Sequence, residues 1–411
     1  MKRLSVLLTV LLFSYTVYAG GYRVALQGAR MLGMAHAGTA MFNNSEAMFF
    51  NPSGVAFLDG QFNFTFGISL VKSNVKYQNE QYLWQAQTEN PLGTPFYLYL
   101  SYKENEHFYF GMAVYTPYGS TVKWQDGWVG SHLVNKISLK AIYFQPTMVY
   151  KMNDYFSISA AFIAATGSVQ FNKDVNRFLT DDAGNRTDIT LNAEGISGSG
   201  YALGFTIRAA DRISFGVNYR SKIVFKARYG TAELNDAPVF FPRKDAFEAE
   251  LPMPAELSVG LALKPFKNLS LAFDVNRTYW SAYKSLNIDF KSKLPDNKMP
   301  KNWRDVNTFR IGAEFAFNDN LAVRAGYYYD QSPIPAGYFS PDTPSLDSDN
   351  YTFGFTYSHK KFAFDFAFLY VDGKERTDSY NFYKEGLGAP RFEGTYVTNA
   401  FVPSFGFNLK L

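Results

Sequence analysis

Residues that commonly carry out catalysis are sparse in this chain of 411 residues. Cysteine is absent, which excludes disulfides and thiol chemistry. The four histidines, His36, His107, His132 and His359, are too scattered to form a metal-ligand motif. GISGSG at 195–200 resembles a nucleophile elbow, but neither serine has glycine both two residues before and two residues after it. With no phosphate-binding loop either, the sequence predicts no enzyme and no cofactor.

Two acidic stretches are the remaining candidates for metal chemistry. TDDAGN at 180–185 and SLDSDN at 345–350 offer carboxylate and amide oxygens, which are the ligands that Ca²⁺ prefers. Solvated turns account for the same residue types. The sequence therefore predicts no bound metal.

Charged residues also occur within segments that alternate between apolar and polar positions. They lie on the polar phase, where other segments carry small or apolar residues. A surface with apolar patches between charge pairs suits an apolar molecule better than an ion. The alternative is that the charges pair with one another and stiffen the structure. The charged positions are Asp274, Arg310, Glu314, Arg324, Asp330 and Asp365.

The alternation extends through nearly all of the chain after Gln61. QFNFTFGISLV at 61–71, KFAFDFAFLY at 361–370 and FVPSFGFNLKL at 401–411 each place large apolar residues at every second position. A period of two is typical of a β-strand with two different faces. Strands of about ten residues with one apolar face are typical of transmembrane barrels.

Connections of alternating length give the strand count. Tight turns with Asn, Asp or Lys follow every second strand, and long loops follow the others, as in outer-membrane barrels. A soluble sandwich or propeller is the alternative, but no blade-length repeat occurs. The sequence predicts an all-β fold, a closed antiparallel transmembrane barrel of fourteen strands. The predicted strands are 61–72, 95–104, 107–116, 137–152, 154–172, 188–209, 211–228, 247–265, 268–290, 305–317, 319–330, 349–359, 361–372 and 396–411.

Composition and the N-terminus agree with this setting. Aromatic residues make up 18% of the chain, although the mean hydropathy is slightly negative. The formal charge of +4 is spread without a basic cluster, so nucleic acid is not an expected partner. Residues 1–19 have a basic start, an apolar run and Val-Tyr-Ala before Gly20, which predicts a secretory signal peptide. A membrane anchor is the alternative, but the run is shorter than the about 20 residues that a spanning helix requires.

Residues 20–60 do not alternate and form a separate predicted region. GGYRVALQGARMLGMAHAGTAMF at 20–42 is rich in Gly, Ala and Met, and NNSEAMFFNPSG at 43–54 ends in a turn that a helix cannot continue. Small residues allow close packing inside a tube. We expect this region to be a plug, or hatch, within the barrel formed by 61–411; the alternative is a plain linker.

Six segments in order resemble the FadL/TodX family of outer-membrane transporters for long-chain fatty acids and other hydrophobic compounds. The resemblance covers essentially the whole mature chain, and no single segment is specific alone. The segments are GGYRVALQGARMLGMAHAGTA at 20–40, NPSG at 51–54, TPYGSTVKWQDGWVG at 116–130, LPMPAELSVGLAL at 251–263, RTYWSAYKSLNI at 277–288 and FRIGAEFAFNDNLAVRAGYYYDQSPIP at 309–335.

The resemblance implies a monomeric barrel whose hatch gates passive uptake. A ligand docks in an outer groove, moves to a pocket near the hatch, and leaves sideways where the third strand kinks. The family's Asn-Pro-Ala turn packs at that kink. Gly111 is the expected flexible point of the strand 107–116, which Pro117 follows. The matching hatch and gate positions are Gly33, Ala35, Gly38, Phe49, Phe50, Asn51, Pro52 and Ser53.

Ligand contacts are predicted on a loop and on the lumen face. Val239, Phe240 and Phe241 form an apolar cluster on an outer loop, where exposed apolar residues often bind ligands. They could equally tuck against another loop. Arg310 and Arg324 are the lumen cations that we expect to contact a ligand. The family binds the ligand carboxylate through basic residues. Asn287 stands where the resemblance leads us to expect one.

Three functions compete. The main prediction is uptake of long-chain fatty acids or similar hydrophobic compounds across the outer membrane, with membrane lipids around the barrel; neutral hydrocarbons are the alternative substrates. A lipid hydrolase would need a Ser–His pair at the rim, and His132 is the loop histidine available for it. A structural or adhesive barrel would transport nothing.

Overall fold

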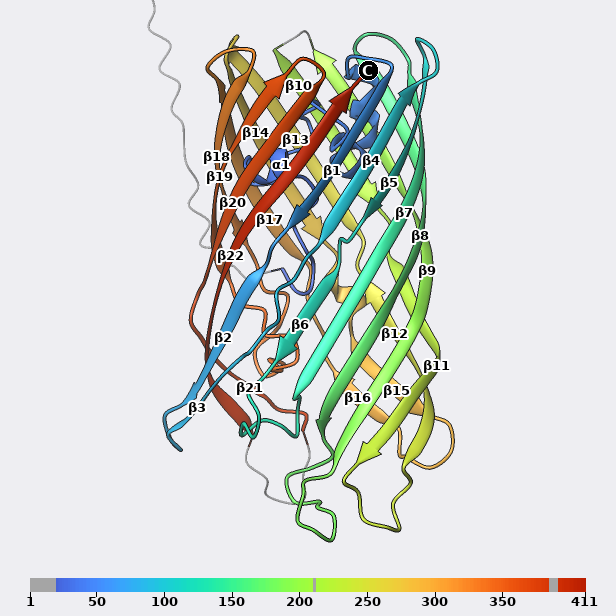
Figure 1. The fold of residues 1–411 in the computed structure, drawn as a ribbon, viewed down its shortest axis with the longest axis vertical. Helices are drawn as coiled ribbons and strands as arrows, with labels where there is room; N and C mark the ends of the chain where they lie inside the picture. Colours follow the sequence, from blue (N-terminus) through green and yellow to red (C-terminus); the bar gives the residue numbers. More distant parts are fainter. Residues whose placement is uncertain (1–19, 210–211, 384–390) are drawn as a thin grey trace, which may run out of the picture.

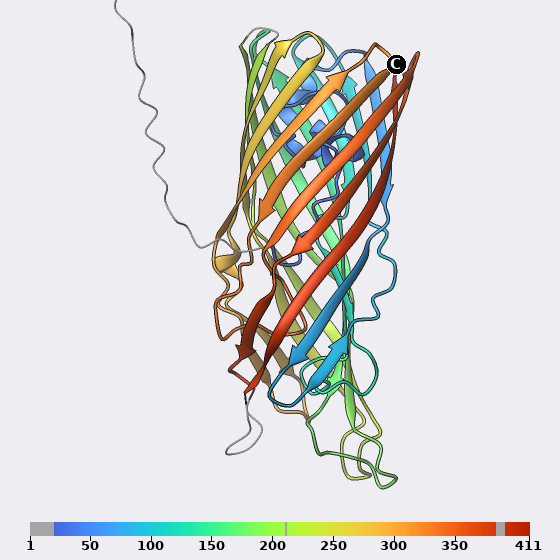
Figure 2. The same ribbon diagram turned by 90° about the vertical axis from the view of Figure 1, so that its left-hand side faces the viewer.

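The computed structural model describes residues 20–209, 212–383 and 391–411. The predicted signal peptide, residues 1–19, and the predicted turn at 210–211 lie outside these residues. The chain forms a closed barrel of fourteen antiparallel strands, seen from the side in Figure 1 and turned by 90° in Figure 2. The barrel closes where the first strand pairs with the last, from Asn63 with Lys410 to Ser69 with Ser404.

Several of the fourteen strands consist of two segments. In chain order they are β1 (Phe62–Ser69) with β2 (Lys72–Asn79), β3 (Trp84–Gln87) with β4 (Phe96–Lys103), β5 (Phe108–Tyr115) with β6 (Gly119–Lys123), β7 (Lys136–Lys151), β8 (Phe156–Asp174), β9 (Asp188–Ala209), β10 (Ile213–Arg220) with β11 (Ile223–Asn235), β12 (Lys244–Met253) with β13 (Glu256–Phe266), β14 (Leu269–Thr278) with β15 (Ser285–Phe290), β16 (Asn297–Pro300) with β17 (Val306–Ala316), β18 (Leu321–Asp330), β19 (Ser348–His359), β20 (Phe362–Gly373) with β21 (Arg376–Tyr380), and β22 (Phe392–Lys410).

The prediction of a fourteen-stranded barrel is confirmed. Asparagines close the tight turns because their side chains accept backbone N–H bonds there, as Asn105 does from His107 (2.9 Å) and Asn153 from Tyr155 (2.8 Å). We call this the turn end of the barrel and the opposite end the loop end. The strands extend further toward the loop end than predicted: the first continues through β2 to Asn79.

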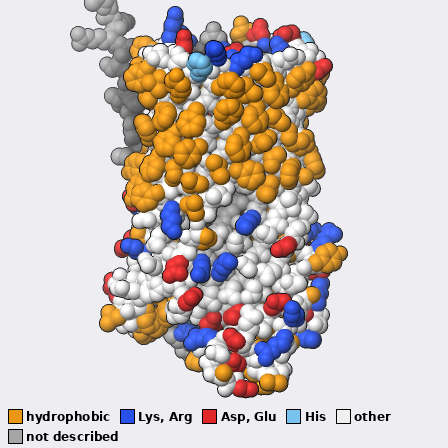
Figure 3. Space-filling model, viewed as in Figure 1, with side chains coloured by type: hydrophobic (Ala, Val, Ile, Leu, Met, Phe, Trp, Pro, Cys, Tyr) orange, Lys and Arg blue, Asp and Glu red, His pale blue; other side chains and the backbone are white. Residues whose placement is uncertain are grey.

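An apolar belt crosses the face of the barrel shown in Figure 3 next to the turn end, and exposed apolar side chains occur at this level on strands from β1 to β22. Charged side chains gather at the turn end above the belt, and the surface toward the loop end is mostly polar. Among the described residues, no helix is long and apolar enough to cross a membrane. The belt includes the exposed side chains of Phe66, Phe110, Phe144, Met148, Ile158, Phe162, Leu203, Phe309, Ile311, Phe353, Phe364 and Phe407.

The N-terminal region lies inside the barrel at the level of the belt, as both ribbon views show. It contains two helical turns, α1 (Ala29–Leu32) and α2 (Ala47–Phe50), and a 3₁₀ helix, η1 (Pro52–Phe57). These elements are too short to be stable alone, so contacts with the barrel wall hold them. We refer to residues 20–57 as the N-terminal region.

Glycines on the inward face of the wall allow this close packing. A Cβ atom on Gly216 would lie 2.0 Å from the Thr39 carbonyl oxygen, and one on Gly312 would lie 2.4 Å from that of Met34. Gly204, Gly260, Gly326, Gly354 and Gly406 make similar approaches. We expected the small and apolar inward residues to form apolar patches that suit an apolar molecule. At Gly204 and Gly260 the N-terminal region packs on these positions instead.

Candidate functional site

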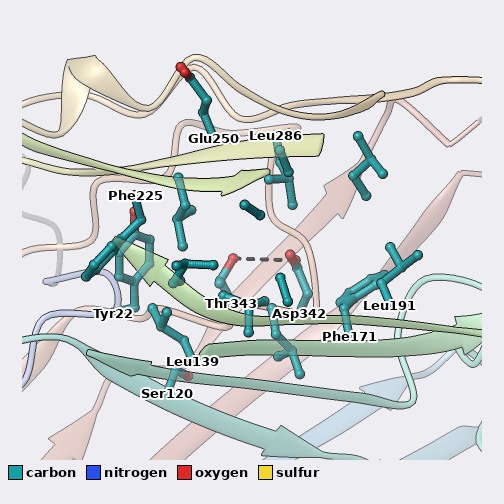
Figure 4. Close-up of a pocket in the computed structure, with 18 of the residues that line it drawn as sticks. Tyr22, Ser120, Leu139, Phe171, Leu191, Phe225, Glu250, Leu286, Asp342 and Thr343 are labelled. Carbon is teal, nitrogen blue, oxygen red and sulfur yellow. Dashed lines mark hydrogen bonds between the residues drawn. The ribbon is translucent and has the colours of Figure 1, made fainter. Parts of the chain in front are cut away.

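An apolar cavity lies inside the barrel between the N-terminal region and the loop end (Figure 4). The empty space between its lining atoms is about 800 Å³, including the part open to solvent. Little of this space is wide enough for a water molecule, so the cavity is a narrow slot. Its walls include Ile137, Leu139, Val169, Phe171, Leu191, Ala193, Ile196, Phe225, Phe247, Leu251, Leu286 and Ile288.

A change of polarity along the strands creates this cavity. Near the turn end, β7 points Gln145 and Thr147 inward and Met148 outward into the belt. Toward the loop end, the same strand points Leu139 inward and exposes Lys140. Both faces keep the period of two. Along β7, the inward side chains become apolar beyond the apolar belt, where the outward side chains become polar. The apolar cavity therefore lies in the part of the barrel toward the loop end.

Polar groups at the cavity are already paired. Asp342 lines it and forms an almost completely buried ion pair with Lys301, with 2.8 Å between Nζ and Oδ2. Burial alone would raise the pKa of Asp342, but the Lys301 ammonium holds it below its ordinary value. Thr343 also donates to Asp342 (3.4 Å, Figure 4). Glu250 points away from the cavity and pairs with Lys226 at 3.4 Å. Among the described residues that line the cavity, none is a cation that could pair with a charged ligand.

Five buried aromatic side chains lie at the end of the cavity nearest the N-terminal region: Tyr22, Tyr118, Trp280, Tyr283 and Trp303, which we call the aromatic partition. Tyr22 is at its centre, with ring centroids 4.7 Å from Trp280, 5.6 Å from Trp303 and 6.1 Å from Tyr118. The partition separates the cavity from a second, polar space.

The polar chamber lies on the other side of the partition and has about 450 Å³ of empty space. Arg23 lines it, although the adjacent Tyr22 lines the apolar cavity. Glu256 lies 3.9 Å from Arg23 and 3.5 Å from Arg220. Burial, together with Arg310, lowers the pKa of His36 well below its ordinary value. Because Arg23, Arg220 and Arg310 outnumber the one carboxylate of the lining, Glu256, the chamber is a positively charged space beside an apolar one.

The third strand is interrupted beside this chamber. Its ladder with β4 ends at Tyr97 and Tyr115, and β6, beginning at Gly119, pairs with β7. The N-terminal region fills the break. The N–H of Val24 donates to the Pro117 carbonyl (2.8 Å), and the N–H of Gly119 donates to the Tyr22 carbonyl (3.2 Å). Gln27 also donates to the Thr116 carbonyl (2.9 Å).

We expected this strand to end at Pro117 and to be flexible at Gly111, and the structure places the interruption next to Pro117 rather than at Gly111. Gly111 is paired on both sides, with Ser101 and Thr147, and the interruption lies at residues 116–118. A Cβ on Gly111 would lie 2.5 Å from the Met48 side chain, so this glycine makes room for α2. The cause of the break is the sequence Thr-Pro-Tyr, since proline lacks the N–H that a ladder needs.

The Asn-Pro-Ser turn does not lie at the break. Asn51 donates to the carbonyl of Phe205 (3.0 Å) and to the hydroxyl of Thr206 (3.1 Å), both on β9. Ser53 donates to the Asn51 side chain (2.7 Å), and its carbonyl accepts from Ser157 on β8 (2.8 Å). This turn anchors the N-terminal region to a continuous part of the wall.

The other predicted hatch residues are packing positions. Gly33 approaches the backbone of Gly354, and Gly38 lies against the Phe50 ring. Ala35 has a positive φ of 56°, which places its backbone in the left-handed region. The ring of Phe49 packs on Tyr115, with centroids 5.1 Å apart, next to the break in the third strand.

The predicted lumen arginines do not reach the apolar cavity. Arg310 donates to Asn276 (2.6 Å) and to the Ala35 carbonyl (3.0 Å), at the edge of the polar chamber. Arg324 donates to Glu314 (2.5 Å), which also accepts from Arg30 of α1 (2.7 Å). The alternative that lumen charges pair with one another holds here, and the pairing extends to the N-terminal region.

The predicted loop cluster lies away from the cavity. Val239 and Phe240 are 81% and 84% exposed at the loop end, while Phe241 is partly buried against the core. The residues that line the cavity were missed. The signal for them was present in KISLK at 136–140, where the apolar phase is opposite to that of Phe144 and Met148.

Among residues 20–209, 212–383 and 391–411, the candidate catalytic and metal-binding groups are not assembled into a site. His132 is buried, and its Nε2 lies 3.1 Å from an Arg177 guanidinium nitrogen. Burial and Arg177 lower its pKa to about 3. In the part of the chain that the structure describes, no three His, Asp or Glu side chains could hold a metal ion.

Comparisons with known proteins agree with this architecture. Residues 10–410 match the model of a family described as outer membrane protein transport protein (OMPP1/FadL/TodX). A putative outer membrane protein of Neisseria meningitidis serogroup B is 24% identical over 384 residues, 81% of each chain. The long-chain fatty acid transport protein of Escherichia coli K12 is 22% identical over 323 residues, 69% of this chain and 72% of that protein.

Two solved structures share the fold. A Pseudomonas aeruginosa FadL homologue superposes with a TM-score of 0.82 at 20% identity, covering 95% of this chain and all of that one (100%). The Pseudomonas putida toluene transporter TodX gives a TM-score of 0.70 at 17% identity, covering 96% and 99%.

Proposed function

Because this chain belongs to the OMPP1/FadL/TodX family of outer membrane transport proteins, we propose that it is a channel for passive uptake of long-chain fatty acids or similar hydrophobic compounds. It resides in the outer membrane, with the apolar belt in the lipid and the turn end toward the periplasm. The observation that carries the proposal is the apolar cavity, which Tyr22 helps to close, and Tyr22 belongs to the segment that fills the break in the wall.

The cavity supplies the driving force for binding. Each methylene that leaves water for an apolar site contributes about 0.8 kcal/mol. A hydrocarbon chain therefore enters a slot lined by Leu139, Phe171 and Leu191 without energy coupling. A neutral hydrocarbon is not expected to pass straight through the barrel by way of the polar chamber. An apolar molecule gains no binding free energy from the charged side chains there.

The exit in this proposal is lateral. Residues 22–27 complete the wall at Thr116–Gly119 through a few backbone bonds, and their withdrawal opens the barrel to the surrounding lipid. Residues 20–60 then act as the hatch, of which 29–57 stay anchored by the glycine contacts and by Asn51. Residues 61–411 form the transmembrane barrel, and residues 1–19 are the signal peptide. The protein acts as a single barrel and catalyses no reaction.

Two substrate classes fit the cavity. Relatives carry the names long-chain fatty acid transport protein and toluene transporter. The lining favours neutral compounds because its described residues include no Lys or Arg, and its buried carboxylate, Asp342, is paired with Lys301. Fatty acids need a cation for their carboxylate, and the polar chamber inside the barrel offers Arg23 and Arg220.

Uptake by cells tests the proposal. Cells expressing the chain should accumulate radiolabelled oleate or toluene above an empty-vector control, and removal of Gly20–Phe50 should alter the rate. Uptake of toluene alone would assign neutral hydrocarbons. Uptake of neither compound, from a barrel shown to be folded by its heat-modifiable gel mobility, would overturn the proposal and leave a structural barrel.

A further inference from the structure

The barrel wall has a second interruption, between the eighth and ninth strands. The ladder of β13 and β14 ends at Glu256 and Thr278, with one further bond from the Tyr279 N–H to the Ala255 carbonyl (2.9 Å). Pairing resumes only at Ala249 and Ile288, between β12 and β15. Between these points the ninth strand leaves the wall through a short 3₁₀ turn, η2 (Trp280–Ala282). Residues 250–254 therefore form a local sheet edge inside a closed barrel.

At Pro252 and Pro254 of this edge, the backbone N–H is absent and the carbonyl is hydrogen-bonded. Pro252 and Pro254 have no N–H, so neither can leave an unpaired donor. The Pro252 carbonyl accepts from the Tyr22 hydroxyl (2.6 Å), and the Pro254 carbonyl accepts from the Tyr118 hydroxyl (3.2 Å). An edge protected in this way persists without a partner strand.

The gap lies between the apolar cavity and a groove on the outer surface. The outer groove has about 1310 Å³ of empty space, including the part open to solvent, and is lined by Pro252, Ala282, Ser285 and Asn287, among others. Ala227, Ala249 and Glu250 line both spaces. Glu250 and Leu286 lie at the edge of the cavity in Figure 4. Side chains alone, rather than a hydrogen-bonded ladder, therefore separate the two spaces here.

The outer groove carries an excess of unpaired positive charge. Within the described residues, no carboxylate forms an ion pair with Lys222, Arg228 or Lys284 of its lining. Its acidic residues are mostly neutralised, since Glu250 pairs with Lys226 (3.4 Å) and Glu248 with Lys291 (2.9 Å). β11, β12 and β15, which carry the groove, lie beyond the apolar belt (Figures 1 and 3). Among the described residues of the lining, Lys222, Arg228 and Lys284 thus outnumber the one acidic residue without an ion pair, Asp289, on the outer side of a gap that only side chains close.

We propose that this gap is a side port that binds single-chain anionic amphiphiles, with the alkyl chain in the apolar cavity and the anionic headgroup on Lys222, Arg228 and Lys284. The inference rests on the proposed function in that the cavity must accept a hydrocarbon chain. It adds an entrance on the side of the barrel, separate from the break in the third strand, and it gives a charged ligand the cations that the cavity lining lacks.

Site-specific labelling tests the opening, because the chain has no cysteine of its own. In intact cells, a membrane-impermeant maleimide should react with L286C at the gap. Filling the groove with A282W should slow this reaction at least about fivefold. N287W serves the same purpose if A282W gives no folded barrel. An L286C variant that does not react, or that reacts equally fast with both groove substitutions, overturns the side port.

Ligand protection tests the headgroup assignment. Decanoate should protect L286C from labelling. The double substitution K222E/K284E should raise the decanoate concentration needed about tenfold, because a like charge then faces the carboxylate. Protection by decanol should stay unchanged, and K267E, in the turn at the other end of the same strand pair, is the matched control. Equal effects on decanoate and decanol, or no protection by decanoate, would overturn the anionic site. Uptake of toluene by the wild type depends on neither Lys222 nor Lys284. If toluene uptake persists while the anionic site fails its test, only the side port is overturned and the proposed function stands.

Discussion

The hydroxyl of Tyr22 donates a 2.6 Å hydrogen bond to the carbonyl of Pro252, a residue 230 positions later in the chain. Tyr22 thereby touches three features at once. Its ring closes the apolar cavity, its own carbonyl accepts from Gly119 in the break of the third strand, and its hydroxyl satisfies the edge of the eighth strand. The state of the N-terminal region is thus linked to both interruptions of the barrel wall.

Replacing Tyr22 by Phe should loosen residues 20–28 while leaving the barrel folded. The Pro252 carbonyl would lose its partner in a buried setting, which costs about 1–3 kcal/mol. Hydrogen exchange followed by mass spectrometry should show backbone protection of this segment falling by roughly tenfold or more. Tyr155→Phe, at an exposed tyrosine near the turn end, is the control. Unchanged protection in Tyr22→Phe would refute the link.

Replacing Gly216 by Ala should displace the N-terminal region from the wall. The new Cβ would lie 2.0 Å from the Thr39 carbonyl oxygen, and such overpacking costs about 1–3 kcal/mol. Limited proteolysis should cut within residues 29–57 faster than in the wild type, and the barrel should keep its heat-modifiable mobility. Gly119→Ala, whose Cβ has nothing closer than 3.4 Å, should leave the cleavage rate unchanged. Equal resistance of the two variants would contradict anchoring by the glycines.

Substitutions on opposite faces of β7 distinguish the effect of the cavity on ligand binding from the effect of the outer surface. Leu139→Gln places an amide in the apolar slot, where a polar group without a partner costs about 1–3 kcal/mol. Binding of a hydrophobic ligand to the purified protein should weaken about tenfold. Lys140→Gln, one residue later and exposed, should bind as the wild type does. A cavity with no role in binding would give the same affinity for both variants.

The hatch should loosen as the pH rises toward neutrality, because Glu46 is buried in it. Its carboxylate accepts from the N–H groups of Arg30 (3.1 Å) and Met31 (2.9 Å). Burial, and next the nearby Asp365, raises its pKa to about 7 from 4.5. A raised folded pKa contributes stability that is full below 4.5 and is lost as the pH rises through 7.

Proteolysis of the N-terminal region at pH 5 and pH 8 measures this effect. The ratio of wild-type to Glu46→Gln cleavage rates should rise with pH, and taking the ratio cancels the pH dependence of the protease. A ratio that stays constant, or that falls, would show that Glu46 does not set the pH response.

Alternation of residue types was sufficient to predict the barrel, because lipid outside and polar groups inside leave a period-two signature in segments such as 361–370. It did not predict how far the strands extend. In β2, KSNVKYQN, neither face contacts lipid, so the signature weakens although pairing with β22 continues.

The interior was harder to predict for a specific reason. In the sequence, Arg324 and Arg310 look like cations that face the lumen and could bind a ligand. Only the fold shows that Arg324 donates a hydrogen bond to Glu314 and that Arg310 donates to the Ala35 carbonyl. The break at Thr116–Tyr118 follows from a proline visible in the sequence. The segment that fills it, Tyr22–Gln27, comes from about ninety residues away, and strand patterns alone do not predict such a contact.

The central claim is that withdrawal of this segment from the break permits uptake, and a reversible lock tests it directly. Arg23 and Tyr118 are antiparallel partners whose flanking residues carry the hydrogen bonds. Such pairs have Cα atoms about 4.5 Å apart, which lies within the range that a disulfide spans. In the cysteine-free chain, the double variant R23C/Y118C forms one defined link. Oleate or toluene uptake by cells with the oxidised variant should fall to the empty-vector level and return on reduction, while each single variant stays insensitive to reductant. Equal uptake in the oxidised and reduced states would show that the ligand does not leave through this break.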